Sequence, residues 1–333
     1  MNNINVVGLD IAKEVFHLVG LEHSGKQVLK KKLSRKKLVD FIEKLPSCLI
    51  AMEGCGSAHY WAREFSRLGH QVKLLPAQYV KAYVRGNKND YNDALAIAEA
   101  SQVPELRAVT AKTPEQQSLQ AVIKIRASHI KTRTALCNQM RGLLQEFGYT
   151  IPKGVHQVRQ RVLDILSTET ALISLFIDAL ELNYLLLCRL DEQIEQLTQM
   201  IERHSRQHPE IKRLQSIPGF GPLVASAFFN AVGDGSGFKR GRDVSAAIGL
   251  VPKQHSSGGK SILLGISKRG DGYLRSLVVH GSRAVVAHAA KKSDALSSWI
   301  NQLVSRRGKH KAIVALANKL TRIATFDTST CDI

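Results

Sequence analysis

The sequence has few cysteines and no long apolar segment. Its cysteines are scattered, odd in number and without paired spacing: Cys48, Cys55, Cys137, Cys188 and Cys331. This pattern provides neither a disulfide framework nor a cysteine zinc site, and it is typical of a reducing compartment. No apolar run approaches membrane-spanning length, and the N-terminus has no signal-peptide core. We therefore expect a cytoplasmic protein with no membrane partner.

Acidic residues are also scarce relative to basic ones. The 333 residues contain 47 Lys and Arg against 28 Asp and Glu, a formal net charge of +19. From residue 210 to the end, 19 basic residues face 7 acidic ones, so this stretch alone carries +12. A concentrated positive surface is the electrostatic signature of a polyanionic partner such as nucleic acid. The alternative is a basic surface that is only solvated.

The first third of the chain has the pattern of an α/β domain. The expected elements are strands over 4–10, 14–21 and 26–34, a helix ending at Pro46, a strand over 48–52, a helix over 57–68 and a strand over 72–75. The first strand is almost continuously apolar, as in a strand that is buried on both faces. Three strands followed by alternating helix and strand is the element order of an RNase H-like (RuvC-like) fold.

The middle of the chain predicts two long amphipathic helices. Between residues 113 and 149, apolar residues recur mostly at steps of three and four. A second stripe of the same kind comprises Leu182, Leu186, Leu190, Ile194, Leu197 and Ile201. We expect the two helices to pack as a coiled-coil arm. An ordinary helical bundle within one globule is the alternative.

Four acidic residues lie where a fold of this kind would bring them together. Asp10 and Glu53 each end a predicted strand, and Asp90 and Asp93 open a predicted helix about one turn apart. Such carboxylates can hold two divalent cations about 4 Å apart, the usual requirement for cutting phosphodiesters. A structural alternative is that Asn89 or Asp90 only caps the helix. A Gly-Leu-Asp strand end also occurs in sugar kinases and actin-like ATPases, but no second glycine-rich phosphate loop follows at a suitable distance.

The basic C-terminal part predicts a mainly helical domain with loops at 217–222, 231–242 and 252–272. In the first loop, Gly219 and Gly221 belong to a Pro-Gly-Phe-Gly turn that looks like the hairpin of a helix-hairpin-helix element. In such a hairpin, backbone N–H groups at the start of the second helix hold a phosphate. A plain glycine–proline turn is the alternative.

The third loop places two serines among cations. Ser256 and Ser257 precede a Gly-Gly pair, and the basic residues around them are Lys253, Lys260, Lys268 and Arg269. A serine hydroxyl there is well placed to attack phosphorus while a metal or the cations stabilise the leaving oxygen. A flexible loop without a catalytic role is the alternative.

Six motifs, in this order and spacing, resemble the DEDD transposases of site-specific bacterial insertion sequences. They are Gly-Leu-Asp-Ile-Ala-Lys, Met-Glu-Gly-Cys-Gly-Ser, Lys-Asn-Asp-Tyr-Asn-Asp-Ala, Ile-Pro-Gly-Phe-Gly, Gly-Leu-Val-Pro, and Ser-Ser-Gly-Gly-Lys followed by Ser-Lys-Arg-Gly-Asp. The resemblance covers residues 4–325. It implies a RuvC-like N-terminal domain and a C-terminal transposase domain.

The resemblance also implies roles for particular residues and partners. The implied Mg²⁺ ligands, for two ions, are Asp10, Glu53, Asp90 and Asp93. Ser257 is the implied nucleophile for a covalent 5′-phosphoserine link to DNA, with Ser256 beside it as the other candidate. Members of the family use an element-encoded guide RNA that pairs with donor and target DNA, and they assemble as dimers that form tetramers.

We therefore expect four segments: a RuvC-like catalytic domain over 1–110, a coiled-coil arm over 111–207, a transposase domain over 208–325 and a tail over 326–333 that lacks a basic, helical ending. The expected function is a DNA transposase or recombinase that mobilises its own insertion sequence in the bacterial cytoplasm, in association with the nucleoid. Two alternatives stay open. One is a Holliday-junction endonuclease that uses metal-activated water, and the other is a non-catalytic nucleic-acid-binding protein.

Overall fold

The computed structural model describes residues 4–87, 89–168 and 172–329, with side chains up to residue 325. The chain divides into two compact units, Met1–Glu115 and Gln116–Ile333. Within the described residues, no helix is both long and apolar enough to cross a membrane. The four cysteines in this part of the chain are free thiols.

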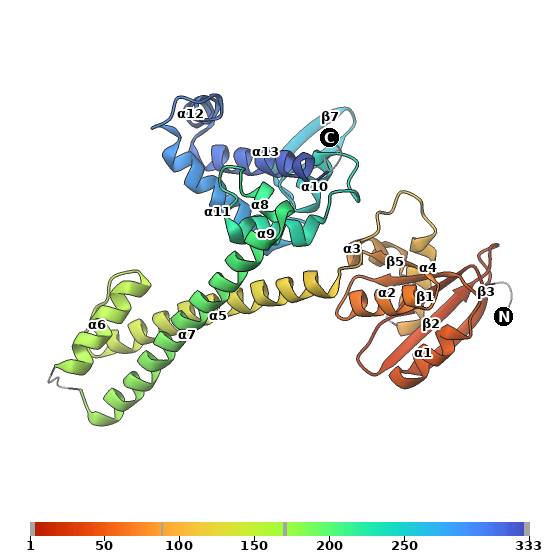
Figure 1. Cartoon of the computed structure of the whole chain (residues 1–333), viewed down its shortest axis with the longest axis horizontal. Coiled ribbons are helices and arrows are strands. Elements are labelled where there is room, and N and C mark those ends of the chain that lie inside the picture. The colour runs from red at the N-terminus through yellow and green to blue at the C-terminus, as the bar shows by residue number, and fades with distance from the viewer. Residues whose placement is uncertain (1–3, 88, 169–171, 330–333) are drawn as a thin grey trace. The chain divides into compact units, whose positions relative to one another are not determined.

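The N-terminal unit is built on a five-stranded mixed sheet in the order β3-β2-β1-β4-β5 (Figure 1). The strands are β1 (Val6–Asp10), β2 (Val15–Leu21), β3 (Gln27–Ser34), β4 (Leu49–Glu53) and β5 (Gln71–Leu75). β1, β2 and β3 pair antiparallel, whereas β4 is parallel to β1 and β5 is parallel to β4. The five predicted strands are confirmed to within two residues at each end, and the sheet is consistent with an RNase H-like fold.

Helices cover both faces of this sheet. They are α1 (Arg35–Glu43), α2 (Ala58–Arg67), the short α3 (Ala77–Val80) and η1 (Lys81–Tyr83), and α4 (Asp90–Ser101). α1 and α2 pack on one face in a core that includes Trp61 and Phe65, and α4 packs on the other face through its alanines. β1 contributes Val7 and Leu9 to the first core and Val6 to the second, so its apolar run does reflect burial on both faces.

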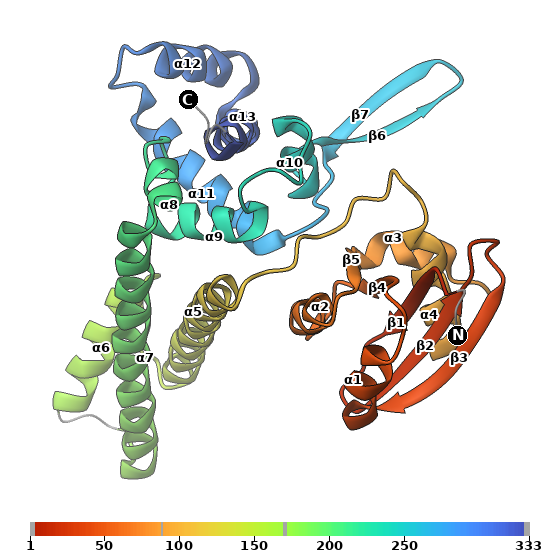
Figure 2. The ribbon, with the colours of Figure 1, turned by 45° about the vertical axis from the view of Figure 1, so that its right-hand side comes forward.

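Two long helices open the second unit: α5 (Pro114–Glu146), whose first turn spans the boundary between the units, and α7 (Ser174–Gln207). The helix α6 (Val155–Ser167) packs against them (Figures 1 and 2). Asp191 of α7 ties the three helices together. Its carboxylate oxygens lie 2.7 Å from Arg133 of α5 and 3.2 Å from Arg159 of α6.

The predicted apolar stripe of α7 is wrong in its first half. Leu182 and Leu186 are 69% and 47% exposed, whereas Leu180 and Leu187 are buried. The reason is that α7 packs here against α6 as well as α5, and the leucines that enter this three-helix core lie on a different face of α7. Further along, Leu190, Ile194 and Ile201 are buried as expected.

The rest of the second unit is mainly helical. Its helices are α8 (Pro209–Leu214), α9 (Pro222–Val232), α10 (Gly241–Ala247), α11 (Gly272–Ala289), α12 (Ala295–Arg307) and α13 (Lys309–Ser329). The loops expected at 217–222 and 231–242 are present apart from helical residues at their ends. The backbone of α13 continues to Ser329, into the segment expected as a tail, and residues 330–333 lie outside the described part of the chain.

One β-hairpin replaces most of the third expected loop. β6 (Pro252–Ser257) and β7 (Lys260–Ile266) pair antiparallel and project from the helices of this unit (Figure 2). The prediction of a loop over 252–272 is therefore wrong. Gly258 and Gly259 both adopt positive φ angles, 54° and 77°, and this conformation closes a two-residue turn between twisted strands.

Candidate active site

The first two acids lie side by side at one end of the N-terminal sheet. β1 and β4 are parallel neighbours with Leu9 opposite Met52, so Asp10 and Glu53 follow at the carboxyl ends of both strands. Both acids are half-buried. Parallel strands deliver their carboxyl-end side chains to the same edge of a sheet, so the order of the strands alone accounts for this pairing.

Helix α4 brings in the other two acids. The N-cap residue is Asn89, whose side-chain oxygen accepts a hydrogen bond from the backbone N–H of Tyr91 at 2.9 Å. Asp90 is therefore the first helical residue and is not the cap, so the capping alternative does not apply to it. Asp93 follows in the same first turn of the helix.

Gly8 allows α4 to lie directly on β1. A Cβ atom at position 8 would overlap the carbonyl oxygen of Ala94 and would lie 2.6 Å from the nitrogen of Ala98. Only glycine in the strand, opposite small residues in the helix, permits this close backbone approach. Because Asp90 and Asp93 belong to the same helix, this packing sets their distance from the end of β1.

The charges of the four acids act on one another. The pKa of Asp10 is raised to about 6, mainly by burial and also by repulsion from Asp93, Asp90 and Glu53, while His17 opposes the shift. Burial, followed by the charge of Asp93, also raises the pKa of Glu53. Carboxylates that repel one another, three of them half-buried and Asp90 exposed, are the donor set that hard divalent cations prefer.

His17 is a further polar side chain of this site that the sequence pattern did not single out. It lies on β2 directly opposite Asp10, is 7% exposed, and its Nδ1 is 3.3 Å from Oδ2 of Asp90. One ligand atom from each of these three residues lies within 4.8 Å of the others; Glu53 and Asp93 are not members of this tighter group. Pairing the first two predicted strands as a hairpin would have indicated position 17.

The two candidate serines lie at the tip of the hairpin. Successive side chains of a strand point to opposite faces, so Ser256 and Ser257 face in opposite directions. Ser256 accepts a hydrogen bond from Nε2 of Gln254 at 3.0 Å. Ser257 is on the same face as His255 and pairs with Lys260 across the turn.

The basic residues expected around the serines are all exposed: Lys253, Lys260, Lys268 and Arg269. The first two lie on the hairpin, and the other two lie in the connection from β7 to α11. This connection has a fixed shape: Lys268, at a φ of 56°, donates its backbone N–H to the carbonyl oxygen of Gly249 at 3.1 Å. The carbonyl oxygen of Arg269 accepts a hydrogen bond from the Arg275 guanidinium at 2.8 Å.

The two glycines expected to contact phosphate have different surroundings. They lie in the turn between α8 and α9. Gly219 has a φ of 86°, and a Cβ atom there would lie 2.8 Å from the carbonyl oxygen of Gly281 in α11, so close backbone packing accounts for this glycine. Gly221 faces open space and borders a small cavity of about 150 Å³ that Arg126 and Thr198 also line.

Two family models match successive parts of the chain. Residues 7–148 match the DEDD model of IS110-type transposases, described as a transposase. Residues 211–297 match the model described as the transposase IS116/IS110/IS902 family. The chain belongs to this family.

Relatives of this IS110-family transposase match it over nearly its full length. It is 44% identical to a probable family 20 transposase of Pseudomonas aeruginosa, over 99% of this chain and 98% of the relative. It is 43% identical to the transposase for insertion sequence element IS1111A of Coxiella burnetii, over 96% and 88%. It is 39% identical to the transposase for insertion sequence element IS1328 of Yersinia enterocolitica, over 97% and 96%. The predicted family is confirmed.

This IS110-family transposase is thus an enzyme that cuts and joins DNA and mobilises an insertion sequence. Its activity requires binding to DNA, and its DEDD domain implies a divalent metal ion. The donor chemistry fits such an ion, because four carboxylates gather at one edge of the sheet, where burial and the charges of the other three raise the pKa of Asp10.

Proposed function

We propose that this transposase cuts and rejoins DNA with a Mg²⁺ site formed by Asp10, Glu53, Asp90 and Asp93, and with Ser257 as the nucleophile. The observation that carries the metal site is the convergence of the four carboxylates, whose mutual repulsion adds to burial in raising the pKa of Asp10. The finer assignment of a RuvC-like nuclease domain is supported by the strand order of the sheet.

Two Mg²⁺ ions are the occupants that this donor set favours, because the ligands are hard carboxylate oxygens. When bound, such ions stabilise the attacking and leaving oxygens of a phosphoryl transfer. His17 has a positioning role: its imidazole lies against Asp90 and orients that carboxylate, as ring nitrogens beside metal sites commonly do.

Ser257 is the better candidate for the nucleophile, because the side chains beside it on its face of β6 differ from those beside Ser256 on the other face. On the face of Ser257, His255 offers an imidazole that can accept the hydroxyl proton, and Lys260 offers a positive charge for the phosphate. On the other face, the Ser256 hydroxyl is engaged by Gln254. An unassisted serine is a poor nucleophile, so a neighbouring base is the decisive difference.

In the proposed step, the Ser257 oxygen forms a bond to phosphorus while the bond between phosphorus and the DNA 3′-oxygen breaks. The hydroxyl proton passes to a base, for which His255 is the candidate, and the departing 3′-oxygen takes up a proton. The 5′ end of the DNA is then held as a phosphoserine ester. Attack by another 3′-hydroxyl reverses the exchange and rejoins DNA without ATP.

The proposed partners are donor DNA, target DNA, an element-encoded guide RNA and further copies of the chain. The excess of 19 basic over 7 acidic residues from position 210 onward supports the nucleic acids, as do the exposed cations near the serines. The RNA, the dimer and the tetramer rest on the family resemblance. We also propose that α5 and α7 form the coiled-coil arm, and that the protein acts in the cytoplasm.

For the helix-hairpin-helix-like element, Gly221 is the proposed phosphate contact, because it faces open space at the start of α9. Gly219 has a packing role against α11 instead. The four acids and Ser257 belong to different units of the chain. The reaction therefore requires that both reach the same phosphate, within one chain or between chains of an oligomer.

A suicide DNA substrate tests the serine directly. With Mg²⁺ and the guide RNA, we expect the wild-type protein to form a protein–DNA adduct that survives denaturation. Ser257→Ala should bind DNA without forming the adduct, and the matched variant Ser256→Ala should keep it. An adduct that persists in Ser257→Ala and disappears in Ser256→Ala would show that Ser256 is the nucleophile.

The same assay separates the alternatives. Mg²⁺-dependent nicking by the wild-type protein without any adduct would mean a Holliday-junction-type endonuclease that uses water. Binding without cleavage would mean a non-catalytic nucleic-acid-binding protein. For the metal site, Asp10→Ala and Asp93→Ala should each lower the recombination rate by several orders of magnitude while DNA binding is kept. Wild-type rates in both Asp10→Ala and Glu53→Ala would contradict the metal assignment.

A further inference from the structure

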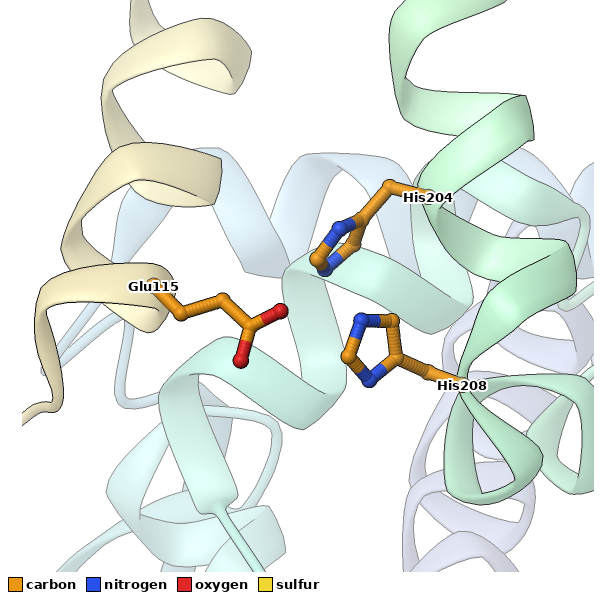
Figure 3. Close-up of side chains that lie close together, drawn as sticks. All are labelled: Glu115, His204 and His208. Atoms are coloured by element: carbon orange, nitrogen blue, oxygen red, sulfur yellow. The ribbon is translucent and has the colours of Figure 1, made fainter.

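Glu115, His204 and His208 gather at the base of the helical arm. Glu115 lies in the first turn of α5, His204 lies in the last turn of α7, and His208 is the C-cap residue of α7. Figure 3 shows the carboxylate of Glu115 directed toward both imidazole rings. One ligand atom from each side chain lies within 4.8 Å of the other two, and the two ring centroids are 4.1 Å apart.

The helices hold these side chains in place for separate reasons. His204 and His208 are four residues apart, a spacing that puts two side chains on the same face of a helix. The start of α5 is anchored to the rest of the second unit, because the Asn230 side chain of α9 donates a hydrogen bond to the carbonyl oxygen of Gln116 at 2.6 Å. The cluster is therefore part of a fixed junction between α5, α7 and α9.

We propose that Glu115, His204 and His208 form a second metal site, distinct from the carboxylate site, which binds Zn²⁺ or a similar transition-metal cation. Two imidazole nitrogens and one carboxylate oxygen are a frequent ligand set for such ions. Mg²⁺ and Ca²⁺ prefer oxygen ligands alone, so the chemistry of this cluster differs from that of the four acids. A water molecule would complete a tetrahedral site.

The ligand atoms of the three side chains are close enough together that only side-chain rotation is needed for them to bind one ion. Ligand atoms around a tetrahedral Zn²⁺ with bonds of about 2.0–2.1 Å lie about 3.3 Å apart. The separations in the cluster are at most 4.8 Å, and Glu115 is exposed while both histidines are half-buried. Rotation of these side chains can therefore bring the ligand atoms together without movement of the helices. The C-terminal end of α7 adds a favourable field, because a helix dipole stabilises positive charge there.

A bound ion would connect the first turn of α5 to the last turn of α7. Glu115 is the second residue of α5, so the ion would hold the N-terminal end of this helix against α7. The site is structural in this sense and takes no part in the chemistry at the four acids. Its occupancy would determine how tightly the first turn of α5 is held against the last turn of α7.

Titration of the full-length protein with Zn²⁺ in the presence of millimolar Mg²⁺ tests the proposal, because Mg²⁺ then competes for the carboxylates. We expect one Zn²⁺ per chain, and Co²⁺ in its place should give the visible absorption bands of a nitrogen-ligated ion. His204→Ala and His208→Ala should each weaken binding by more than about 100-fold, because loss of a residue that only hydrogen-bonds to a metal ligand already costs about 10–100-fold. Glu115→Gln should weaken binding as well.

Two control variants make the test specific. His156→Ala removes an exposed histidine of α6 and should leave the affinity unchanged. Asp10→Ala should also bind Zn²⁺ normally in this assay, which separates the result from the proposed nuclease mechanism. His204→Gln with His208→Gln keeps polar side chains in case the alanine variants fold poorly, and Zn²⁺ should raise the melting temperature of the wild-type protein but not of this variant.

The proposal is overturned if the wild-type protein does not bind one Zn²⁺ per chain under these conditions. It is also overturned if the paired glutamine variant binds Zn²⁺ as tightly as the wild-type protein. In either case the three side chains form only an ion-paired contact between two helices.

Discussion

Replacing Asp10 by Asn should stabilise the metal-free protein and at the same time abolish recombination. In the folded chain, Asp10 is half-buried and repelled by three other acids, and its pKa is raised from 3.8 to about 6. At neutral pH this carboxylate is therefore ionised where a charge is unfavourable. Asn has nearly the same shape but carries no charge and is a poorer ligand for Mg²⁺.

The pH dependence of the effect follows from the direction of that shift. Below about pH 3.8, Asp10 is protonated in both the folded and the unfolded protein, and its charge costs the fold nothing. Between pH 3.8 and about 6, the unfolded chain releases the proton first, so stability falls as the pH rises, and the loss is complete above pH 6. A shift of about two pKa units corresponds to about 3 kcal/mol. Solvent screening of a half-buried group reduces this to about 1–2 kcal/mol.

Thermal unfolding in the presence of a chelator measures this effect. For a domain of about 100 residues, 1 kcal/mol shifts the melting temperature by about 4–8 °C, so Asp10→Asn should raise the melting of the N-terminal unit at pH 7.5 by several degrees. The advantage should disappear near pH 4, and Asp40→Asn, at an exposed position of α1, should show none of it. Added Mg²⁺ should stabilise the wild-type protein but not Asp10→Asn. An unchanged or lower melting temperature of Asp10→Asn at pH 7.5 in chelator would refute the electrostatic reasoning.

Three further predictions concern packing, positioning and charge. Gly8→Ala should destabilise the N-terminal unit by about 1–3 kcal/mol and lower the recombination rate about 100-fold, because α4 must move away from β1; melting and recombination assays check both. His17→Gln should raise the Mg²⁺ concentration needed for half-maximal activity with little loss of melting temperature, since Asp90 loses its imidazole neighbour. Lys268→Glu combined with Arg269→Glu should weaken DNA binding and reduce its dependence on salt concentration, because each lost phosphate contact removes about 0.9 from the logarithmic slope; an unchanged slope would place DNA elsewhere.

The sheet could be predicted from the sequence because its strands are short apolar runs bounded by turn residues. Their order also put Asp10 beside Glu53, since parallel strands end at the same edge. The face of α7 could not be predicted in the same way. Periodicity within one helix does not reveal a third helix, and contact with α6 determines that Leu180 is buried while Leu182 is exposed. The sequence pattern of α7 contains no information on this packing of α6 against it.

The hairpin that carries the serines was not predicted from the sequence for a different reason. All residues of β6 are exposed, so the strand has no alternation of buried and exposed positions from which it could be recognised. The available signal was the Gly258-Gly259 pair, which favours a two-residue hairpin turn. Recognising that turn would also have separated the faces of Ser256 and Ser257, which a loop leaves equivalent.

The exposure of this hairpin has a consequence for the proposed chemistry. An isolated two-stranded hairpin is only marginally stable in water, and none of the residues of β6 is buried. Ser257 therefore lies on an element that gains little stability from packing within the chain, and we expect its geometry to become fixed when a partner packs against it. The four acids, in contrast, lie on a packed sheet and on helix α4, which packs against that sheet, and they need no partner to come together. If Ser257 is the nucleophile, the metal site is ready before DNA binds, whereas the nucleophile becomes ordered only in the assembled complex. Such an order of events would confine cutting to complexes that can also rejoin the strands.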